Sequence, residues 1–199
     1  MVTAKLFLPH LAMPPTRQLP TVGRSHIGSL GRPPCIFVGD QLLKFFSNVR
    51  YRSCERIDPS HIHTDGLTHL NFAFASIDPT GFNITPVDPG DFALYSQFTA
   101  LKSAVMQTWI AIGGFDFSDP GPTYTTWSDM ISTSANRASF ISSLINFMTT
   151  WGFQGVDIDW EYPAIPDRGG RPGDTQNLVS LLADMRAEFG AKYGISVTL

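Results

Sequence analysis

From residue 68 onward, the hydrophobic positions alternate between two kinds of pattern. Short continuous apolar runs occur at 68–77, 107–114 and 195–199, as is typical of strands that are buried on both faces. Between them, apolar residues recur at helical spacing within 91–105, within 136–151 and from Asp174, a candidate helix cap, towards Gly194. This order predicts parallel strands that are joined by crossover helices.

The segment Gly152–Pro163 reads GFQGVDIDWEYP and predicts one further strand with an unusual polar face. Successive side chains of a strand point to opposite faces. Asp157, Asp159 and Glu161 are therefore expected to point the same way. The apolar residues between them should face the surrounding helices.

Two architectures fit the pattern, an open doubly wound sheet and a (β/α)8 TIM-type barrel. No glycine-rich phosphate loop of the GxGxxG kind is present, which disfavours a nucleotide-binding sheet. A complete barrel needs roughly 250 residues, whereas this chain has 199. We therefore expect an α/β fold of the barrel type that is incomplete, with about the first four to five strands. Residues 1–45 are rich in Pro and Gly and are expected to be a loose leader before a barrel domain at 46–199.

Composition narrows the possible partners. The formal net charge is −3, and without a basic stripe a nucleic-acid partner is not expected. No apolar run is long enough to suggest a membrane span. Cys35 and Cys54 could pair with each other, pair elsewhere or stay free. The triplet Asn83-Ile84-Thr85 is a glycosylation sequon, which favours secretion only slightly.

The row of acids is the strongest chemical signal. Close carboxylates raise one another's proton affinity, and a carboxylic acid that keeps its proton can act as a general acid. Glu161, last in the row, is the natural proton donor, with Asp159 orienting a substrate group and Asp157 tuning Asp159. Two alternatives stay open: a solvent-facing edge strand, which suits repeated aspartates poorly, and a site for Mg²⁺ or Ca²⁺.

The segment GVDIDWEYP resembles the Asp-x-x-Asp-x-Asp-x-Glu signature of family 18 glycoside hydrolases, the chitinases. The segments THLNFAFASIDP, WIAIGGFDFSDPG and DRGGRPGDTQN resemble those that flank it in fungal members. The resemblance covers about residues 47 to 199. It implies the N-terminal part of an extracellular, endo-acting enzyme that hydrolyses the β-1,4-N-acetylglucosamine linkages of chitin or chito-oligosaccharides, with no cofactor and no metal.

The resemblance also implies a role for each acid. In this family the acetamido oxygen of the sugar attacks the anomeric carbon, so that configuration is retained by a substrate-assisted route. Glu161 would protonate the leaving oxygen and then deprotonate the incoming water. Asp159 would bind the acetamido N–H, and Asp157 would support Asp159.

Five further residues are candidates to border the substrate: Gly113, Gly114, Phe115, Trp127 and Tyr162. The glycine pair is interpreted as a tight turn beside the cleft. Trp127 is expected in a loop, where its ring could stack on a sugar. Trp109 is expected in the core. The polar segment 167–174 is expected to be a flexible connector more than a direct substrate contact.

The chain departs from the family pattern at several positions. Gln154 replaces the first acid of the signature, where a structural role is expected, and Ala111 replaces a serine that could support the innermost aspartate. The Tyr-Asp pair and the tryptophan that the family's later strands supply are not in the sequence. The alternative function is therefore a non-catalytic chitin-binding or degenerate chitinase fragment.

Overall fold

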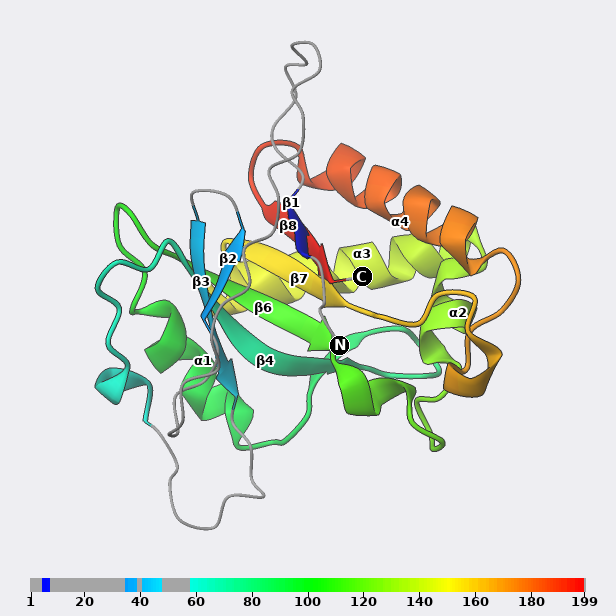
Figure 1. Cartoon of the computed structure of the whole chain (residues 1–199), viewed down its shortest axis with the longest axis horizontal. Coiled ribbons are helices and arrows are strands. Elements are labelled where there is room, and N and C mark those ends of the chain that lie inside the picture. The colour runs from blue at the N-terminus through cyan, green and yellow to red at the C-terminus, as the bar shows by residue number, and fades with distance from the viewer. Residues whose placement is uncertain (1–4, 8–34, 39–40, 48–57, 199) are drawn as a thin grey trace.

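The structure is a computed structural model that describes residues 5–7, 35–38, 41–47 and 58–198. Its described strands form a single sheet (Figure 1). The order across the sheet is β1 (Lys5–Phe7), β8 (Gly194–Thr198), β7 (Gly155–Asp159), β6 (Gln107–Gly113), β4 (His69–Ile77), β3 (Gln41–Ser47) and β2 (Cys35–Val38), with β5 (Ile84–Pro86) paired to β4.

The centre of the sheet is parallel, as the alternation of strands and helices predicts. Strands β3, β4, β6, β7 and β8 run parallel to one another. Strands β1 and β2 pair antiparallel at the two edges. The fold is α/β with a partial parallel sheet, which is consistent with an incomplete (β/α)8 barrel.

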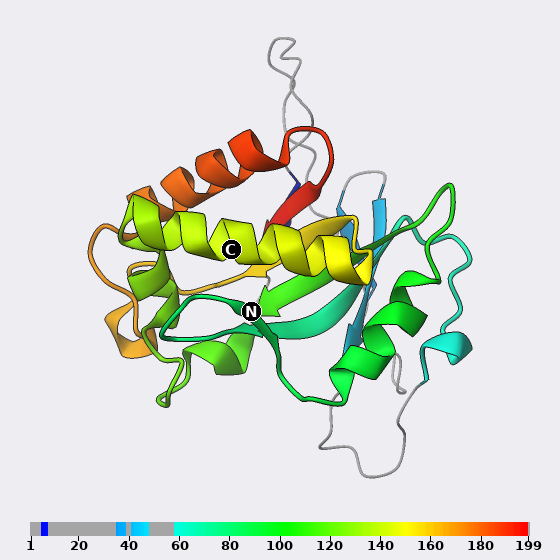
Figure 2. The same ribbon diagram turned by 180° about the vertical axis from the view of Figure 1, so that it is seen from behind.

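The helices cover one face of this sheet. They are α1 (Asp91–Thr99), α2 (Thr126–Ile131), α3 (Ser134–Trp151) and α4 (Asp174–Phe189), together with the 3₁₀ turns η1 (Pro59–His61), η2 (Phe115–Ser118) and η3 (Pro166–Arg168). Figure 2 shows α3 and α4 lying across the sheet from behind, with α1 beside them. The opposite face of the sheet corresponds to the interior of a barrel.

Local sequence explains where the longest helix begins and ends. The side chain of Thr133 accepts a hydrogen bond from the backbone of Asn136, which caps the first turn of α3. Gly152 ends the helix in the left-handed conformation with φ 81°. The chain then turns directly into β7, so α3 acts as the crossover between β6 and β7.

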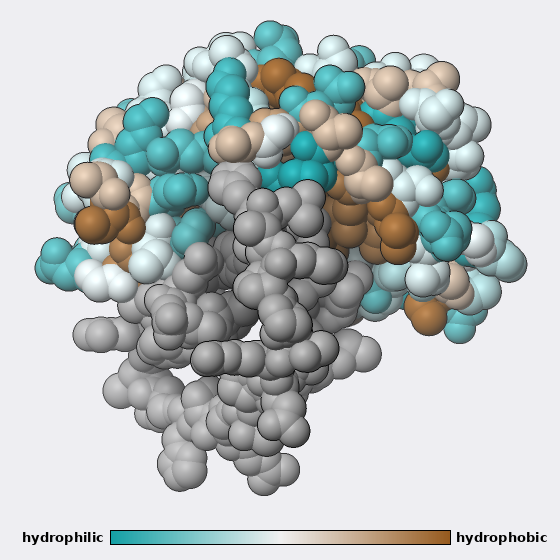
Figure 3. All heavy atoms as spheres, turned by 90° about the horizontal axis from the view of Figure 1, so that it is seen from above, coloured by the Kyte–Doolittle hydropathy of each residue, from teal (hydrophilic) through white to brown (hydrophobic). Residues whose placement is uncertain are grey.

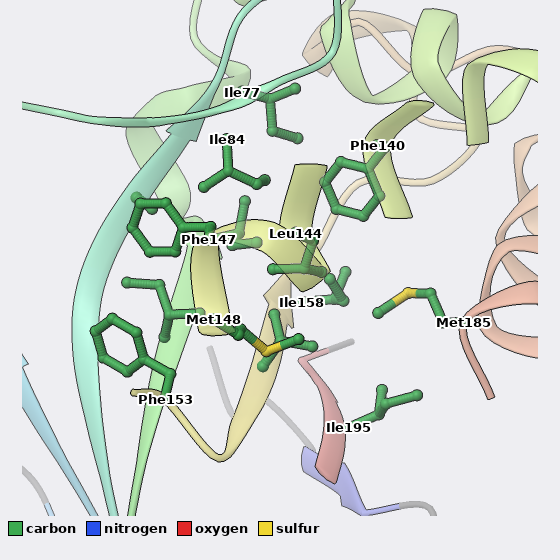
Figure 4. Close-up of a cluster of buried hydrophobic side chains, with 14 of the residues drawn as sticks. Ile77, Ile84, Phe140, Leu144, Phe147, Met148, Phe153, Ile158, Met185 and Ile195 are labelled. Carbon is green, nitrogen blue, oxygen red and sulfur yellow. The ribbon is translucent and has the colours of Figure 1, made fainter. Parts of the chain in front are cut away.

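The core lies between the sheet and the helices (Figure 4). Ile158 of β7 and Ile195 of β8 pack with Leu144 of α3 and Met185 of α4, and all four are almost fully buried. Burial of each aliphatic side chain stabilises the fold by about 1.5–3 kcal/mol. This layer holds β7, and therefore its acids, in a fixed position.

The end of helix α1 and the N-terminal segment differ from the expectation. Helix α1 ends at Thr99 and not at 105, because residues 100–106 form a turn closed by Ser103 N donating to Met106 O. Strands β1 and β2 lie inside the segment expected to be a loose leader. The first residues of β3 also fall in that segment. Its remaining residues and Cys54 lie outside the described residues, so the domain boundary stays a prediction.

On the surface, hydrophobic residues form small groups among hydrophilic ones in the described part of the face seen in Figure 3. Among the described helices, none combines the length and the apolar character needed to cross a bilayer.

Candidate active site

The aspartates of the signature lie at the end of a central strand. Asp157 and Asp159 belong to β7, and Asp159 is its last residue. The final partners of this strand are Gly113, the last residue of β6, and Thr198, the last described residue of β8. The expectation that the strand continues through Glu161 is therefore wrong.

The alternation of side chains nevertheless continues past the end of β7. Val156, Ile158 and Trp160 all belong to the hydrophobic core on the helix side. This alternation leaves the three acids on the other side. Asp157 is fully buried, Asp159 is 9% exposed and Glu161 is partly exposed. The row thus runs from the interior to the rim at the carboxyl ends of the parallel strands, where barrel enzymes carry their active sites.

An indole ring forms the floor beneath the acids. Trp109 is 3% exposed, which confirms that it is buried, and it lies in register with Gly155 of β7. A Cβ atom on Gly155 would come within 2.4 Å of this ring, and one on Gly194 within 2.1 Å. Only glycine, which has no Cβ, leaves room for the indole at these two positions. The buried indole therefore lies against the first residues of β7 and β8, at the buried end of the row of acids.

Asp157 is held by a serine on the adjacent strand. Ser196 Oγ donates a hydrogen bond of 2.5 Å to Asp157 Oδ1, and both residues are fully buried. The two are direct partners in the parallel pairing of β7 and β8. On the other side Asp157 is paired with Ala111, the position where the family has a serine. The missing hydroxyl is thus supplied by β8, and sequence reasoning did not find it.

The glycine pair lies against the last residue of β7. Gly113 and Gly114 have φ values of 98° and 88°, which favour glycine. A Cβ on Gly113 would come within 2.6 Å of Asp159 O, and Gly114 N donates to that same oxygen at 2.9 Å. The pair fixes the backbone of Asp159 through close approach and one hydrogen bond.

Two aromatic residues flank the rim. Phe115 starts η2 directly after the glycines and is 54% exposed. Tyr162 follows Glu161 and is 9% exposed. Burial is the main cause that raises the pKa of Tyr162, and the nearby charge of Glu161 adds to it. The two rings meet edge to face with centroids 6.0 Å apart, so one loop after β6 and one after β7 join at the rim.

The prediction that Trp127 stacks on substrate from a loop is wrong. Trp127 lies in α2 and is only 2% exposed. Its ring stacks on Trp160 with centroids 5.7 Å apart and an interplanar angle of 10°. Both residues belong to the hydrophobic core on the helix side of the sheet. Trp127 therefore packs against the end of β7 and is not available to a sugar.

The segment 167–174 is bound to the rest of the rim and is not a loose connector. Tyr124 donates from its hydroxyl to Pro166 O at 2.8 Å, and the single hydroxyl proton of Ser128 is shared between Gly169 O at 3.0 Å and the nearer carboxylate of Asp174. Asp174 begins α4 but does not cap it, because Gly173 holds the cap position. Its carboxylate instead accepts from Ser128 Oγ at 2.6 Å and from the backbone of the segment itself.

Gln154 has the structural role expected for its position. Its side-chain oxygen accepts from Thr108 N at 3.3 Å, and its backbone bonds to Thr108 O at 2.9 Å and to Gly194 N at 3.0 Å. It therefore ties the start of β7 to both neighbouring strands. An acid is not needed there to hold the strand.

Other polar side chains on the interior face were not found from the sequence. Asn71 of β4 is fully buried, and within residues 58–198 its amide atoms have no hydrogen-bond partner. Within the same residues, the buried hydroxyl of Thr198, which is paired with Asp159 across β7 and β8, also has no hydrogen-bond partner. Within those residues, no group of three or more His, Cys, Asp or Glu side chains is arranged to hold a metal ion.

Comparison with known proteins agrees with this geometry. The chain is 32% identical to Chitotriosidase-1 of Mus musculus over 136 residues, which are 67% of this chain and 27% of that protein. Its structure matches the Group II chitinase catalytic domain 2 of Ostrinia furnacalis with a TM-score of 0.66 and 26% identity, over 74% of this chain and 39% of that one.

A plant class V chitinase mutant from Cycas revoluta, solved in complex with (GlcNAc)3, matches with a TM-score of 0.60 and 25% identity. That match covers 74% of this chain and 40% of the plant chain. This chain thus spans well under half of the relatives it matches. Residues 42–199 match the family described as Glycosyl hydrolases family 18. With more than half of its residues inside that match, the chain belongs to glycosyl hydrolase family 18.

Proposed function

We propose that the chain is the N-terminal part of a retaining chitinase of the fungal type, which hydrolyses β-1,4-N-acetylglucosamine linkages in chitin or chito-oligosaccharides. One observation carries the proposal: a row of three acids whose burial decreases from Asp157 through Asp159 to Glu161, at the carboxyl end of a central parallel strand. The complexed relative supports the choice of sugar.

In the proposed reaction, the most exposed acid transfers the proton and the two buried acids support it. Glu161, partly exposed, donates a proton to the leaving glycosidic oxygen and later accepts one from water. The acetamido oxygen of the substrate bonds to the anomeric carbon as the glycosidic bond breaks. Water, deprotonated by Glu161, then bonds to that carbon and displaces the acetamido oxygen. Asp159 accepts from the acetamido N–H, and Asp157, fixed by Ser196, supports Asp159 from the buried end of the row.

The border of the proposed site is formed by Gly113, Gly114, Phe115 and Tyr162. The glycines let the chain pass close to Asp159 without side chains in the way. Phe115 is the exposed ring, so it is the one proposed to stack on a sugar face. We propose that the protein acts outside the cell, where the sequon at Asn83 would be used.

Incubation with a soluble chito-oligosaccharide tests the proposal. Product anomers followed by NMR in the first minutes should show the β configuration, because two inversions at the same carbon retain it. Initial α product would contradict the substrate-assisted route. Binding of the oligosaccharide with no product at any enzyme concentration would instead indicate a non-catalytic chitin-binding chain.

A further inference from the structure

Arg168 lies between the two loops that form the rim of the site. Its guanidinium carbon is 4.4 Å from the centre of the Phe115 ring and 4.2 Å from the centre of the Tyr162 ring. Both distances are within the range of cation–π attraction. The arginine thus sits between an exposed ring from the loop after β6 and a buried ring from the loop after β7.

Hydrogen bonds fix the guanidinium in this position. Its Nη1 donates to Asp119 Oδ1, and its Nη2 donates to Phe115 O. The side chain of Arg168 is 18% exposed, so little of it is free to move in solvent. Because arginine presents several donors in a rigid plane, one side chain can hold a carboxylate, a carbonyl and two rings at once.

The backbone that carries Arg168 is itself held by the structure behind it. Gly169 has φ 76°, and a Cβ there would come within 1.9 Å of Tyr124 O. The neighbouring carbonyls accept from Tyr124 and Ser128, as described above. The guanidinium is therefore presented from a fixed turn and is not merely resting on the surface.

The residues that Arg168 contacts adjoin two of the three acids. Phe115 follows Gly114, whose N–H binds the carbonyl of Asp159. Tyr162 directly follows Glu161. Each ring therefore lies next in sequence to backbone that contacts or carries an acid, and Arg168 spans the gap between the two rings.

Building on the proposed function, we propose that Arg168 is a positioning residue. It holds Phe115 as a preformed platform for a pyranose ring of the N-acetylglucosamine chain, and it holds Tyr162 beside Glu161. It acts through these two rings without transferring a proton. Preorganisation of this kind raises affinity, because the ring is already ordered before the sugar binds and binding does not have to pay the entropy cost of ordering it.

Three variants test the inference: Arg168→Ala, Arg168→Lys and Arg171→Ala. Arg171 is the matched control, since it lies three residues further on and pairs with Asp129 of α2. Isothermal titration with penta-N-acetylchitopentaose gives Kd when each variant also carries Glu161→Gln, so that the sugar is not hydrolysed. Steady-state kinetics without that substitution separate KM from kcat, and NMR reports the ring signals of Phe115 and Tyr162. The thermal midpoint is measured for all.

Arg168→Ala should raise Kd and KM about tenfold, the order of the cost of ordering one side chain at the moment of binding. It should displace both sets of ring signals, with a smaller effect on kcat. Arg168→Lys keeps the charge without the planar fork, so its Kd should lie between wild type and Arg168→Ala. Arg171→Ala should keep the wild-type Kd and ring signals.

Equal Kd values and ring signals for Arg168→Ala and Arg171→Ala would overturn the inference. So would a rise in Kd that follows the loss of thermal stability equally in both variants, since that is the mark of a purely structural residue. If the wild-type chain binds no oligosaccharide, the proposed function fails and the platform fails with it. In that case the ring signals still decide whether Arg168 positions the two aromatic residues.

Discussion

Ser196 Oγ donates to Asp157 Oδ1 across the pairing of β7 and β8, at a point where both side chains are fully buried. The relationship explains how this chain keeps its innermost acid in place with Ala111 on the other side. The hydroxyl comes from a different strand, but it reaches the same carboxylate.

Ser196→Ala should therefore destabilise the fold and weaken catalysis. Loss of the hydroxyl leaves a buried carboxylate oxygen without this donor, which costs about 1–3 kcal/mol. The free energy of urea unfolding measures the effect. Ser180→Ala is the control, because that hydroxyl bonds to its own helix on α4. Equal stability of the two variants would show that the buried hydrogen bond contributes nothing.

Gly155→Ala tests the floor of the site. Its new Cβ would lie 2.4 Å from the buried ring of Trp109, so the indole or the strand must move. Overpacking of this kind costs about 1–3 kcal/mol. At Gly121 the nearest neighbour of an added Cβ is Asp119 O at 3.8 Å, so Gly121→Ala should be tolerated. Circular dichroism melts of both variants compare them, and matching midpoints would contradict the packing described.

The stability of the fold should fall as the pH drops through the ordinary range of histidine. His69 is 7% exposed and packs edge to face on Trp109 at 4.8 Å. Burial lowers its pKa below the usual 6.5. As the pH falls through about 6.5, this histidine is protonated in the unfolded chain but stays neutral in the folded chain. Acid therefore favours unfolding.

His69→Gln removes this titration, and the loss of unfolding free energy between pH 7.5 and pH 5.5 should become smaller than in wild type. Urea titrations at the two pH values measure it. His63→Gln, at an exposed position, is the matched control. If both variants lose as much stability as wild type, His69 does not carry the pH dependence.

Chelation separates the proposed reaction from a metal-dependent one. The substrate-assisted route uses the acetamido group and Glu161, so hydrolysis in EDTA should equal hydrolysis without it. Initial rates on a chito-oligosaccharide are the measurement, with Mg²⁺ and Ca²⁺ added back afterwards. A rate that disappears in EDTA and returns with either cation would assign the acids to a metal site.

Much of the fold was predictable because buried parallel strands read as continuous apolar runs, and β4, β6 and β8 all do. The two aspartates and the deep-to-rim order of the acids also followed from the alternation of β7. The short edge strands β1, β2 and β5 were missed, since three or four residues carry too little pattern.

The failures at the site come from contacts between distant parts of the chain. Trp127 was misplaced because the six residues of α2 are too few for a helical pattern. The contact between Arg168 and Phe115 spans 53 residues, and only the fold brings them together. Ser196 carried one usable signal, a polar residue between Ile195 and Val197 in an expected strand. Its pairing with Asp157 required the register of the sheet.

Turnover by Glu161→Gln beside wild type, on one soluble chito-oligosaccharide, tests the central claim most directly. Glutamine keeps the shape of the side chain but cannot donate or accept the proton, so kcat should fall by about 10²–10⁴-fold. Binding of the oligosaccharide should persist, which shows that the rim is intact. Wild-type turnover that survives unchanged in Glu161→Gln would contradict the assignment of Glu161 as the catalytic acid.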